Sequence, residues 1–193
     1  MAVEIGDFLA HLRSLPTYAR QIVHIERIPA RSAVYGALAR PLPAALQEAL
    51  RQREASHLYI HQAEAINAVR DGHHVMVVTG TASGKTLCYN APVLEAALAD
   101  PLARALYLFP TKALAQDQLR SLRELTSPFK TIRFGAYDGD TERSARDRLR
   151  KNAAIILTNP DMLSMGILPN HPAWAVFFRH LKYVVLDEAR VAS

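Results

Sequence analysis

Blocks of apolar residues alternate along the chain with blocks of mixed apolar and polar spacing. From residue 57 onward, short and nearly continuous apolar runs predict strands, and longer stretches of helical periodicity predict helices between them. Strands that alternate with helices of about 10–15 residues form βαβ units, and uninterrupted apolar strands are buried on both faces. The pattern therefore predicts an α/β fold with a parallel sheet. The expected strands lie within 74–80, 103–111, 131–139, 153–160 and 181–189, and the expected helices within 61–72, 85–99, 113–125 and about 141–152.

The first 54 residues do not follow this rhythm. Residues 3–15 have helical spacing that ends at Pro16, residues 21–28 are a possible strand, and prolines separate both from a helix expected at about 44–54. We therefore predict a short, mainly helical N-terminal extension over 1–54 and a main domain over 55–193.

Composition adds few constraints. With 50% hydrophobic and 21% charged residues, the chain is typical of a globular protein. The net charge is +5, and 18 of the 23 basic residues are arginine, which suits phosphate contacts but equally reflects a GC-rich genome. The single cysteine, Cys88, leaves no partner for an internal disulfide and favours a reducing compartment. Neither a signal peptide nor an apolar run of about 18 residues is found. We expect a cytoplasmic protein without a membrane segment.

Each expected strand ends in a polar or glycine-containing turn, and such turns meet at one edge of a parallel sheet, where ligands bind. The turn TGTASGKT, residues 79–86, is the most informative. Backbone N–H groups of a loop of small residues, here Thr81, Ala82, Ser83 and Gly84, can surround a triphosphate. Lys85 can reach the outer phosphates and Thr86 can ligate Mg²⁺. Thr79 departs from the strict pattern, which has glycine at this position.

A second acidic element follows the last expected strand. Asp187 can help to hold the Mg²⁺ ion that Thr86 ligates, and Glu188 can orient or deprotonate the attacking water. An isolated Asp-Glu pair is most often a solvated strand end, but its combination with the phosphate loop fits the two halves of one ATP site.

Five segments in order, HQAEAI, TGTASGKT, FPTKALAQDQ, TNPDML and VVLDEA, resemble motifs Q, I, Ia, Ib and II of superfamily-two DEAD/DEAH-box helicases. The turn YDGDT and the stretch GILPNHPAWAVFFRHLKYVVLDEA are similar to one branch, the bacterial helicases of the mitomycin-repair type and their Hrq/RecQ-like relatives. The resemblance implies a RecA-like P-loop fold, ATP and Mg²⁺ as cofactors, and nucleic acid as the partner, with DNA favoured over RNA.

The resemblance also implies roles for individual residues. Gln62 would read the adenine base, Lys85 and Glu188 would be catalytic, and Thr86 and Asp187 would hold Mg²⁺. Asp138, Gly139 and Asp140 match a turn specific to the branch. The path of a nucleic-acid strand would be lined by Pro110, Thr111, Lys112, Gln116, Thr158, Asn159, Pro160 and Asp161.

The last residues depart from the family pattern. Arg190 stands where family members have histidine, and residues 191–193 do not continue the motif, as if the reading frame ended or shifted after Ala189. The resemblance implies a remainder of this motor domain and a second domain that supplies an arginine finger. We therefore expect an incomplete first motor domain, slow ATP hydrolysis, and self-association through a sheet face that further elements would cover.

Other polar and aromatic groups have simpler interpretations. We interpret His57 and His61 as ordinary histidines rather than metal ligands, because no motif places a third ligand. The basic stretch 141–152 is a solvated helix face or the rim of a nucleic-acid site. Helical spacing favours a core role for Trp174, Phe177 and Phe178 over stacking on bases.

Three functions compete at this point. The first is the ATPase part of a helicase or translocase, and the second is a protein that binds ATP and nucleic acid without turnover. Because a protein of the second kind needs neither Lys85 nor Glu188, the first is favoured. The third, a small nucleotide or metabolite kinase, would require neither HQAEAI nor the Asp-Glu pair.

Overall fold

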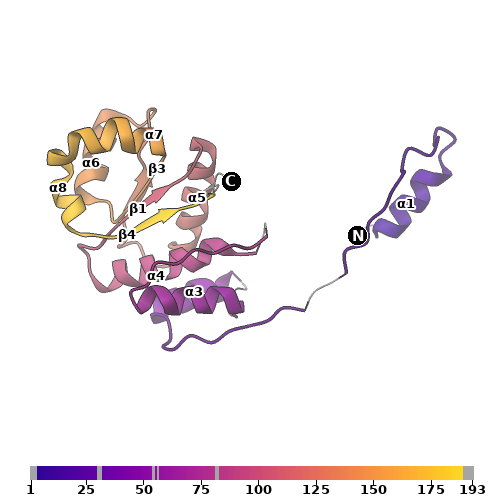
Figure 1. Ribbon diagram of the computed structural model, residues 1–193, viewed down its shortest axis with the longest axis horizontal. Helices are drawn as coiled ribbons and strands as arrows, with labels where there is room; N and C mark the ends of the chain where they lie inside the picture. Colours follow the sequence, from indigo (N-terminus) through magenta and orange to yellow (C-terminus); the bar gives the residue numbers. More distant parts are fainter. Residues whose placement is uncertain (1–3, 30–31, 54, 56, 81–82, 189–193) are drawn as a thin grey trace. The chain divides into compact units, whose positions relative to one another are not determined.

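The computed structural model describes residues 4–29, 32–53, 55, 57–80 and 83–188. The chain divides into two compact units, one up to Ala33 and one from Val34 onward. In the first unit, helix α1 (Ile5–Ser14) has Leu15 as its C-cap, immediately before Pro16, and none of its residues is buried. The larger unit contains all the other elements (Figure 1). The boundary predicted after residue 54 stays a prediction.

The larger unit is built on a four-stranded parallel sheet with the strand order β2-β3-β1-β4. The predicted α/β fold with a parallel sheet is confirmed. Central strand β1 aligns Leu108 with Thr158 of β3 and with Leu186 of β4, so these three strands end at the same level. The strands are β1 (Arg104–Leu108), β2 (Phe134–Ala136), β3 (Ile155–Thr158) and β4 (Leu181–Leu186).

Alternate residues of β1 and β3 point to opposite sides of the sheet, and all of them are buried. Helices therefore cover both faces of the sheet. Tyr107 and Ile155 face a core formed with α2, α3, α4 and α5, whereas Leu106 and Ile156 face a second core that contains Trp174 and the buried face of α8. Figure 1 shows α6 and α8 on one side of the strands and α3 and α4 on the other. The helices are α2 (Ala44–Gln52), α3 (Ile60–Arg70), α4 (Lys85–Ala99), α5 (Lys112–Leu125), α6 (Arg143–Asn152), α7 (Pro160–Met162) and α8 (His171–Arg179).

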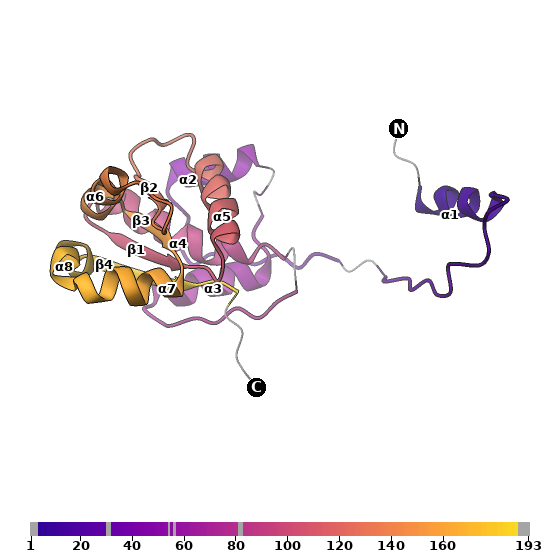
Figure 2. The ribbon, with the colours of Figure 1, turned by 90° about the horizontal axis from the view of Figure 1, so that it is seen from above.

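The connection from α7 to α8 is continuous, through a π-helical turn, Leu163–Ile167, and a 3-10 turn, Leu168–Asn170. The aromatic residues of this region are in the core, as predicted. Trp174 and Phe177 are each 1% exposed, and Trp174 meets Tyr137 edge to face with ring centroids 4.9 Å apart. Helices α2 and α5 lie side by side (Figure 2), with the Arg53 guanidinium after α2 contacting the Ser121 carbonyl and the Glu124 carboxylate of α5.

Two predicted strands are wrong. Residues 74–80 and residues 21–28 form no strand, and Val23, Met76 and Val78 are 93%, 78% and 86% exposed. An apolar, β-branched run favours a strand only where a neighbouring strand supplies hydrogen bonds and a packed layer covers its side chains. In the described residues, neither segment pairs with another strand.

No helix in the described ranges is both long enough and apolar enough to cross a membrane.

Candidate functional site

The polar turns gather at one edge of the sheet, as the sequence predicts. The register places the segments that follow β1, β3 and β4 side by side, and β2 aligns Ala136 with Leu157 of β3, one residue before that strand ends. The Asp187 N–H donates to the Leu108 carbonyl at 3.1 Å, which continues the β1–β4 pairing by one residue. Four of the five predicted turns therefore line this edge through the sheet itself.

The fifth turn, residues 79–86, leads into α4. Gly84 has a φ of +76°, a left-handed conformation that favours glycine, and a Cβ atom at this position would lie 2.5 Å from Gln62 Nε2. The Thr79 and Ser83 hydroxyls lie 2.5 Å apart, so Thr79, at the position of the motif's first glycine, closes the loop through its side chain. Thr81 and Ala82 lie outside the described residues.

The start of α4 has the features of a phosphate site. No side chain caps this helix, whereas Thr111 caps α5 and Asn159 caps α7. Its first N–H groups therefore remain available to an anion, which the helix dipole also favours. The Lys85 ammonium donates to the Thr79 carbonyl at 3.4 Å and has no carboxylate within ion-pair distance in the described residues. A phosphate would meet an unneutralised cation here.

Helix α3 holds this loop in place. Buried Gln62 accepts from the Tyr59 N–H through Oε1 at 2.9 Å and donates from Nε2 to the Gly84 carbonyl at 3.0 Å. His61 Nε2 lies 3.0 Å from the Ser83 carbonyl oxygen, and its ring stacks on that of Tyr59. Gln62 thus links the first turn of α3 to the residue before Lys85. Its role toward adenine stays a prediction.

Tyr89 joins the loop to the acidic pair. It lies on α4 one turn after Lys85, and its hydroxyl donates to Asp187 Oδ2 at 2.9 Å. Burial, and then the charge of Asp187, raise the pKa of the Tyr89 hydroxyl well above its ordinary value, so it remains a proton donor. The hydroxyl also lies 3.4 Å from Gln118 Oε1 on α5, and its ring packs edge to face on that of Tyr107.

The acidic pair itself is arranged around the Asp187 carboxylate. Oδ1 accepts from the Glu188 N–H at 3.0 Å while Oδ2 accepts from Tyr89. Glu188 is exposed and has a φ of +55°, a left-handed conformation that is uncommon for residues other than glycine. Strained backbone of this kind persists where surrounding contacts impose it, and it occurs often at functional sites. The strain turns the Glu188 backbone sharply away from the strand direction.

The start of α5 presents the second group of predicted residues. The Thr111 hydroxyl accepts from the Leu114 N–H at 3.3 Å and so caps the helix. Pro110, Lys112 and Gln116 are exposed. The Lys112 ammonium pairs with Asp140 Oδ2 at 2.7 Å, and this bond, followed by the nearby charges of Asp140 and Asp138, raises the pKa of Lys112.

The turn after β3 presents the third group, but its members differ in exposure. Thr158 is 1% exposed and donates its hydroxyl to the Tyr137 carbonyl at 2.6 Å, so its side chain is internal. Asn159 caps α7 by accepting from the Met162 N–H at 2.7 Å. Pro160 and Asp161 are exposed beside it. Pro160 and Asp161 therefore offer exposed side chains, whereas buried Thr158 and half-buried Asn159 shape the turn.

The branch-specific turn after β2 has a structural role that the motif alone does not reveal. Buried Asp138 accepts, through Oδ1, from the N–H groups of Asp140 and Thr141, each at 3.0 Å. The Arg146 guanidinium donates to the carbonyls of Asp138 and Gly139 and lies over the Tyr137 ring. These bonds hold Asp140 where it meets Lys112.

Sequence reasoning missed Tyr89 and gave His61 no role. A detectable signal exists for Tyr89, because a residue four positions after Lys85 lies on the same face of α4. Its contact with Asp187, 98 positions away, depends on the packing of α4 against the sheet and has no local signal.

Comparison with known proteins agrees with the resemblance of the sequence motifs to helicases. The DEAD/DEAH box helicase family model matches residues 59–192. The ATP-dependent helicase hrq1 of Schizosaccharomyces pombe is 45% identical over 98% of this chain, and the ATP-dependent helicase YprA of Bacillus subtilis is 49% identical over 77%. The chain spans only 18% and 21% of their lengths. The crystal structure of the DUF1998 helicase MrfA bound to DNA and AMPPNP superposes with a TM-score of 0.79 at 45% identity, covering 82% of this chain and 22% of that one.

The residues matched by the family model include the phosphate loop and the four strand-end turns, the last of which carries the Asp-Glu pair. The chain belongs to the DEAD/DEAH box helicase family.

Proposed function

We propose that this chain binds ATP with Mg²⁺ and a nucleic-acid strand as the first motor domain of an ATP-dependent helicase, with DNA favoured over RNA. The names of the relatives, ATP-dependent helicases in yeast and Bacillus subtilis, support the activity. The solved relative bound to DNA and AMPPNP supports both ligands. Because the chain spans about a fifth of those relatives, unwinding belongs to the longer protein.

One observation carries the proposal. The Tyr89 hydroxyl places the Asp187 carboxylate beside the first turns of α4, which also carry Lys85, Thr86 and an uncapped N-terminus. A triphosphate needs cations and N–H donors, and Mg²⁺ prefers oxygen ligands such as a hydroxyl and a carboxylate. Both sets of groups lie at one edge of the sheet, so the residues present fit ATP with Mg²⁺.

In this proposal, bound ATP with Mg²⁺ supplies an activated phosphoryl group, and the residues of the chain position and stabilise it. Thr86 and Asp187 would hold the metal ion, and Lys85 would offset charge on the outer phosphates. Exposed Glu188 would accept a proton from the attacking water. The exposed side chains of Lys112 and Gln116 would contact the nucleic-acid strand, mainly at its phosphates, and exposed Asp161 would lie beside the strand without binding phosphate.

The resemblance assigns the arginine finger to a second motor domain outside residues 1–193. Such an arginine contributes about 10³- to 10⁵-fold in rate in phosphate-transfer enzymes. We therefore infer that this chain alone binds ATP but hydrolyses it slowly. The alternative, a binding protein without turnover, makes the same binding prediction and differs only in hydrolysis.

Titration with a fluorescent ATP analogue, with and without Mg²⁺, tests the binding. We expect Lys85→Ala to abolish Mg²⁺-dependent binding and Lys130→Ala, which removes an exposed charge elsewhere, to leave it unchanged. Equal affinities for the two variants would contradict the proposed phosphate site.

Single-turnover hydrolysis in the presence of single-stranded DNA separates the two functions. Slow hydrolysis that Glu188→Gln removes while ATP binding persists supports the motor function. Hydrolysis that is absent from the native chain and from the longer protein supports the non-catalytic alternative.

A further inference from the structure

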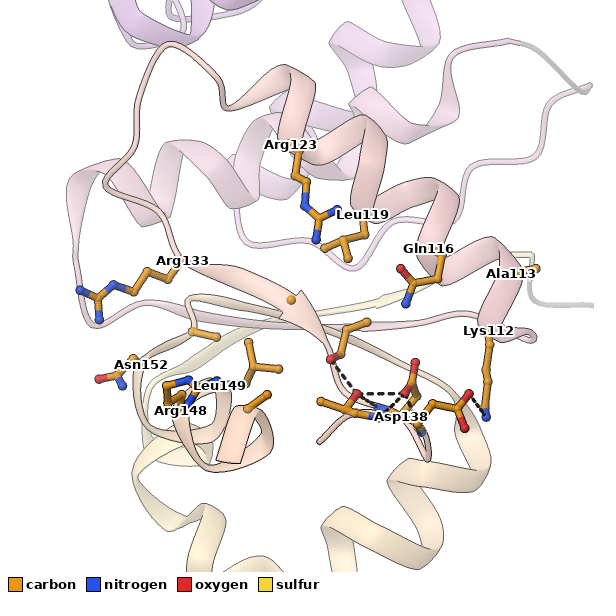
Figure 3. A pocket seen from close by; sticks show the side chains of 16 residues that line it. Lys112, Ala113, Gln116, Leu119, Arg123, Arg133, Asp138, Arg148, Leu149 and Asn152 are labelled. Carbon is orange, nitrogen blue, oxygen red and sulfur yellow. Dashed lines mark hydrogen bonds and ion pairs between the residues drawn. The ribbon is translucent and has the colours of Figure 1, made fainter. Parts of the chain in front are cut away.

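A groove of about 700 Å³ runs along the open edge of the sheet, between α5, β2 and α6 (Figure 3). In the described residues β2 is the edge strand, with β3 as its neighbour on one side. The groove lies on the opposite side of β2. None of the five helicase motifs includes its far half.

The middle of the groove is apolar and firmly packed. Buried Leu119 of α5, half-buried Leu149 of α6 and buried Gly135 of β2 line it. A Cβ atom on Gly135 would lie 2.6 Å from Leu149 Cδ2, so glycine permits the close approach of α6 to the sheet edge. The volume is in the range of small-ligand sites, and an aliphatic side chain such as that of half-buried Leu149 can contact the flat face of a base.

The far half of the groove carries three arginines from three different segments. Arg123 extends from α5 toward the groove, Arg148 lies on the opposite wall, and Arg133 precedes β2 (Figure 3). In the described residues none of the three has a carboxylate within ion-pair distance. By contrast, Arg120 and Arg150 on the outer faces of the same helices pair with Asp117 and Asp147, each at 3.0 Å.

The acidic groups of the groove are already engaged. Asp138 accepts three hydrogen bonds within its own turn, and Asp140 pairs with Lys112. The cations that line the groove, Lys112 and the three arginines, outnumber Asp138 and Asp140, so the groove carries net positive charge. Arginine forms paired hydrogen bonds with phosphate.

The near end of the groove joins the candidate nucleic-acid face. Lys112 and Gln116 line both, so a strand crossing the start of α5 can continue into the groove without leaving the protein surface. This continuity, together with the apolar middle, favours a nucleic-acid strand over an acidic peptide.

We propose that this edge groove binds the continuation of the nucleic-acid strand, with phosphates on Arg123, Arg133 and Arg148 and a base over the half-buried side chain of Leu149. The inference rests on the proposed function and extends it, because it adds a second phosphate-binding segment beyond the helicase motifs. A strand long enough to reach the arginines would bind more tightly, and with a steeper dependence on salt, than a strand that covers the motif edge alone.

The test compares two variants of the full chain by fluorescence anisotropy, using labelled oligothymidylates of about 6 and about 20 nucleotides over a range of salt concentrations. The groove variant is Arg123→Gln/Arg133→Gln/Arg148→Gln. The matched control, Arg120→Gln/Arg150→Gln/Arg179→Gln, removes the same charge from arginines outside the groove, of which Arg120 and Arg179 are exposed and Arg150 is half-buried. Unchanged melting and ATP binding establish that both variants are folded.

We expect the groove variant to bind the longer strand about tenfold more weakly than the control does, with the short strand unaffected. Loss of three phosphate contacts should also reduce the salt slope by about 2. If the native chain binds the strands but the groove variant matches the control at both lengths, the inference is wrong and the proposed function stands. If the native chain binds neither strand, both fail. Binding of poly-glutamate that only the groove variant loses, with strand binding intact, would assign the groove to an acidic peptide instead.

Discussion

Tyr89 connects the two halves of the candidate ATP site through a single hydroxyl group. The hydroxyl donates a hydrogen bond to the Asp187 carboxylate. Its oxygen also lies 3.4 Å from Gln118 Oε1 on α5, the helix that begins at the candidate nucleic-acid face. Tyr89 therefore positions the candidate metal ligand and lies between α4 and α5.

Tyr89→Phe tests this positioning role, because it removes the hydroxyl and keeps the ring that packs on Tyr107. A hydrogen bond to a charged acceptor contributes about 1.5–3 kcal/mol, less where water has access. We expect the affinity for Mg²⁺-ATP to fall about threefold to tenfold and the affinity for ATP without Mg²⁺ to change little. Tyr183→Phe, whose hydroxyl makes no hydrogen bond in the described residues, is the control. A loss of affinity that is equal with and without Mg²⁺ would indicate a packing effect.

Cys88 is a buried thiol, and burial raises its pKa to about 11. At pH 8 about one molecule in a thousand then carries the reactive thiolate. We expect a thiol reagent to label the folded chain far more slowly than the chain unfolded in guanidinium.

The same shift implies a pH dependence of stability. The fold favours the neutral thiol, so the contribution of Cys88 to the free energy of unfolding is complete below pH 9 and is lost as the pH rises toward 11. Cys88→Ala should remove this alkaline component. Equal labelling rates for the folded and unfolded chain would show that the thiol is exposed.

At the scale of elements, the start of α5 combines a helix cap with a predicted ligand contact. Thr111→Ala removes the hydroxyl that accepts from the Leu114 N–H. Loss of such a cap costs about 1 kcal/mol, which lowers the melting temperature by about 2–4 °C in a chain of this size. Thr111→Ser keeps the oxygen and should keep the melting temperature, as differential scanning calorimetry can show. An unchanged temperature for both variants would mean that the cap does not limit stability.

The helices that the sequence predicts correctly have local causes. Thr111 caps α5, Pro16 follows α1, and periodic spacing marks α3 and α4. The segment 74–80 fails because a strand depends on a neighbour that its own residues do not encode. The site divides in the same way. The loop and the acidic pair are recognisable as motifs, but the buried side chain of Thr158 and the Tyr89–Asp187 bond arise only from packing.

At the scale of the whole molecule, β4 presents an uncovered apolar row. Val184 and Leu186 point to the same face and are 55% and 62% exposed, although they lie in a strand of near-continuous apolar residues. An apolar strand with little cover favours association with another surface. We expect this 193-residue chain to self-associate as its concentration rises.

Sedimentation velocity over a range of concentrations tests this expectation. Val184→Thr/Leu186→Thr makes the row more polar, and threonine is a β-branched residue that is common in strands. The monomer of this variant should therefore predominate at concentrations where the native chain associates. Leu168→Thr/Val176→Thr changes two exposed apolar residues away from the sheet and should associate like the native chain. A native chain that is monomeric throughout, or association that both variants reduce equally, would contradict a role for β4. If the β4 variant is monomeric and still binds ATP, the apolar row and the ATP site are separate features of the domain.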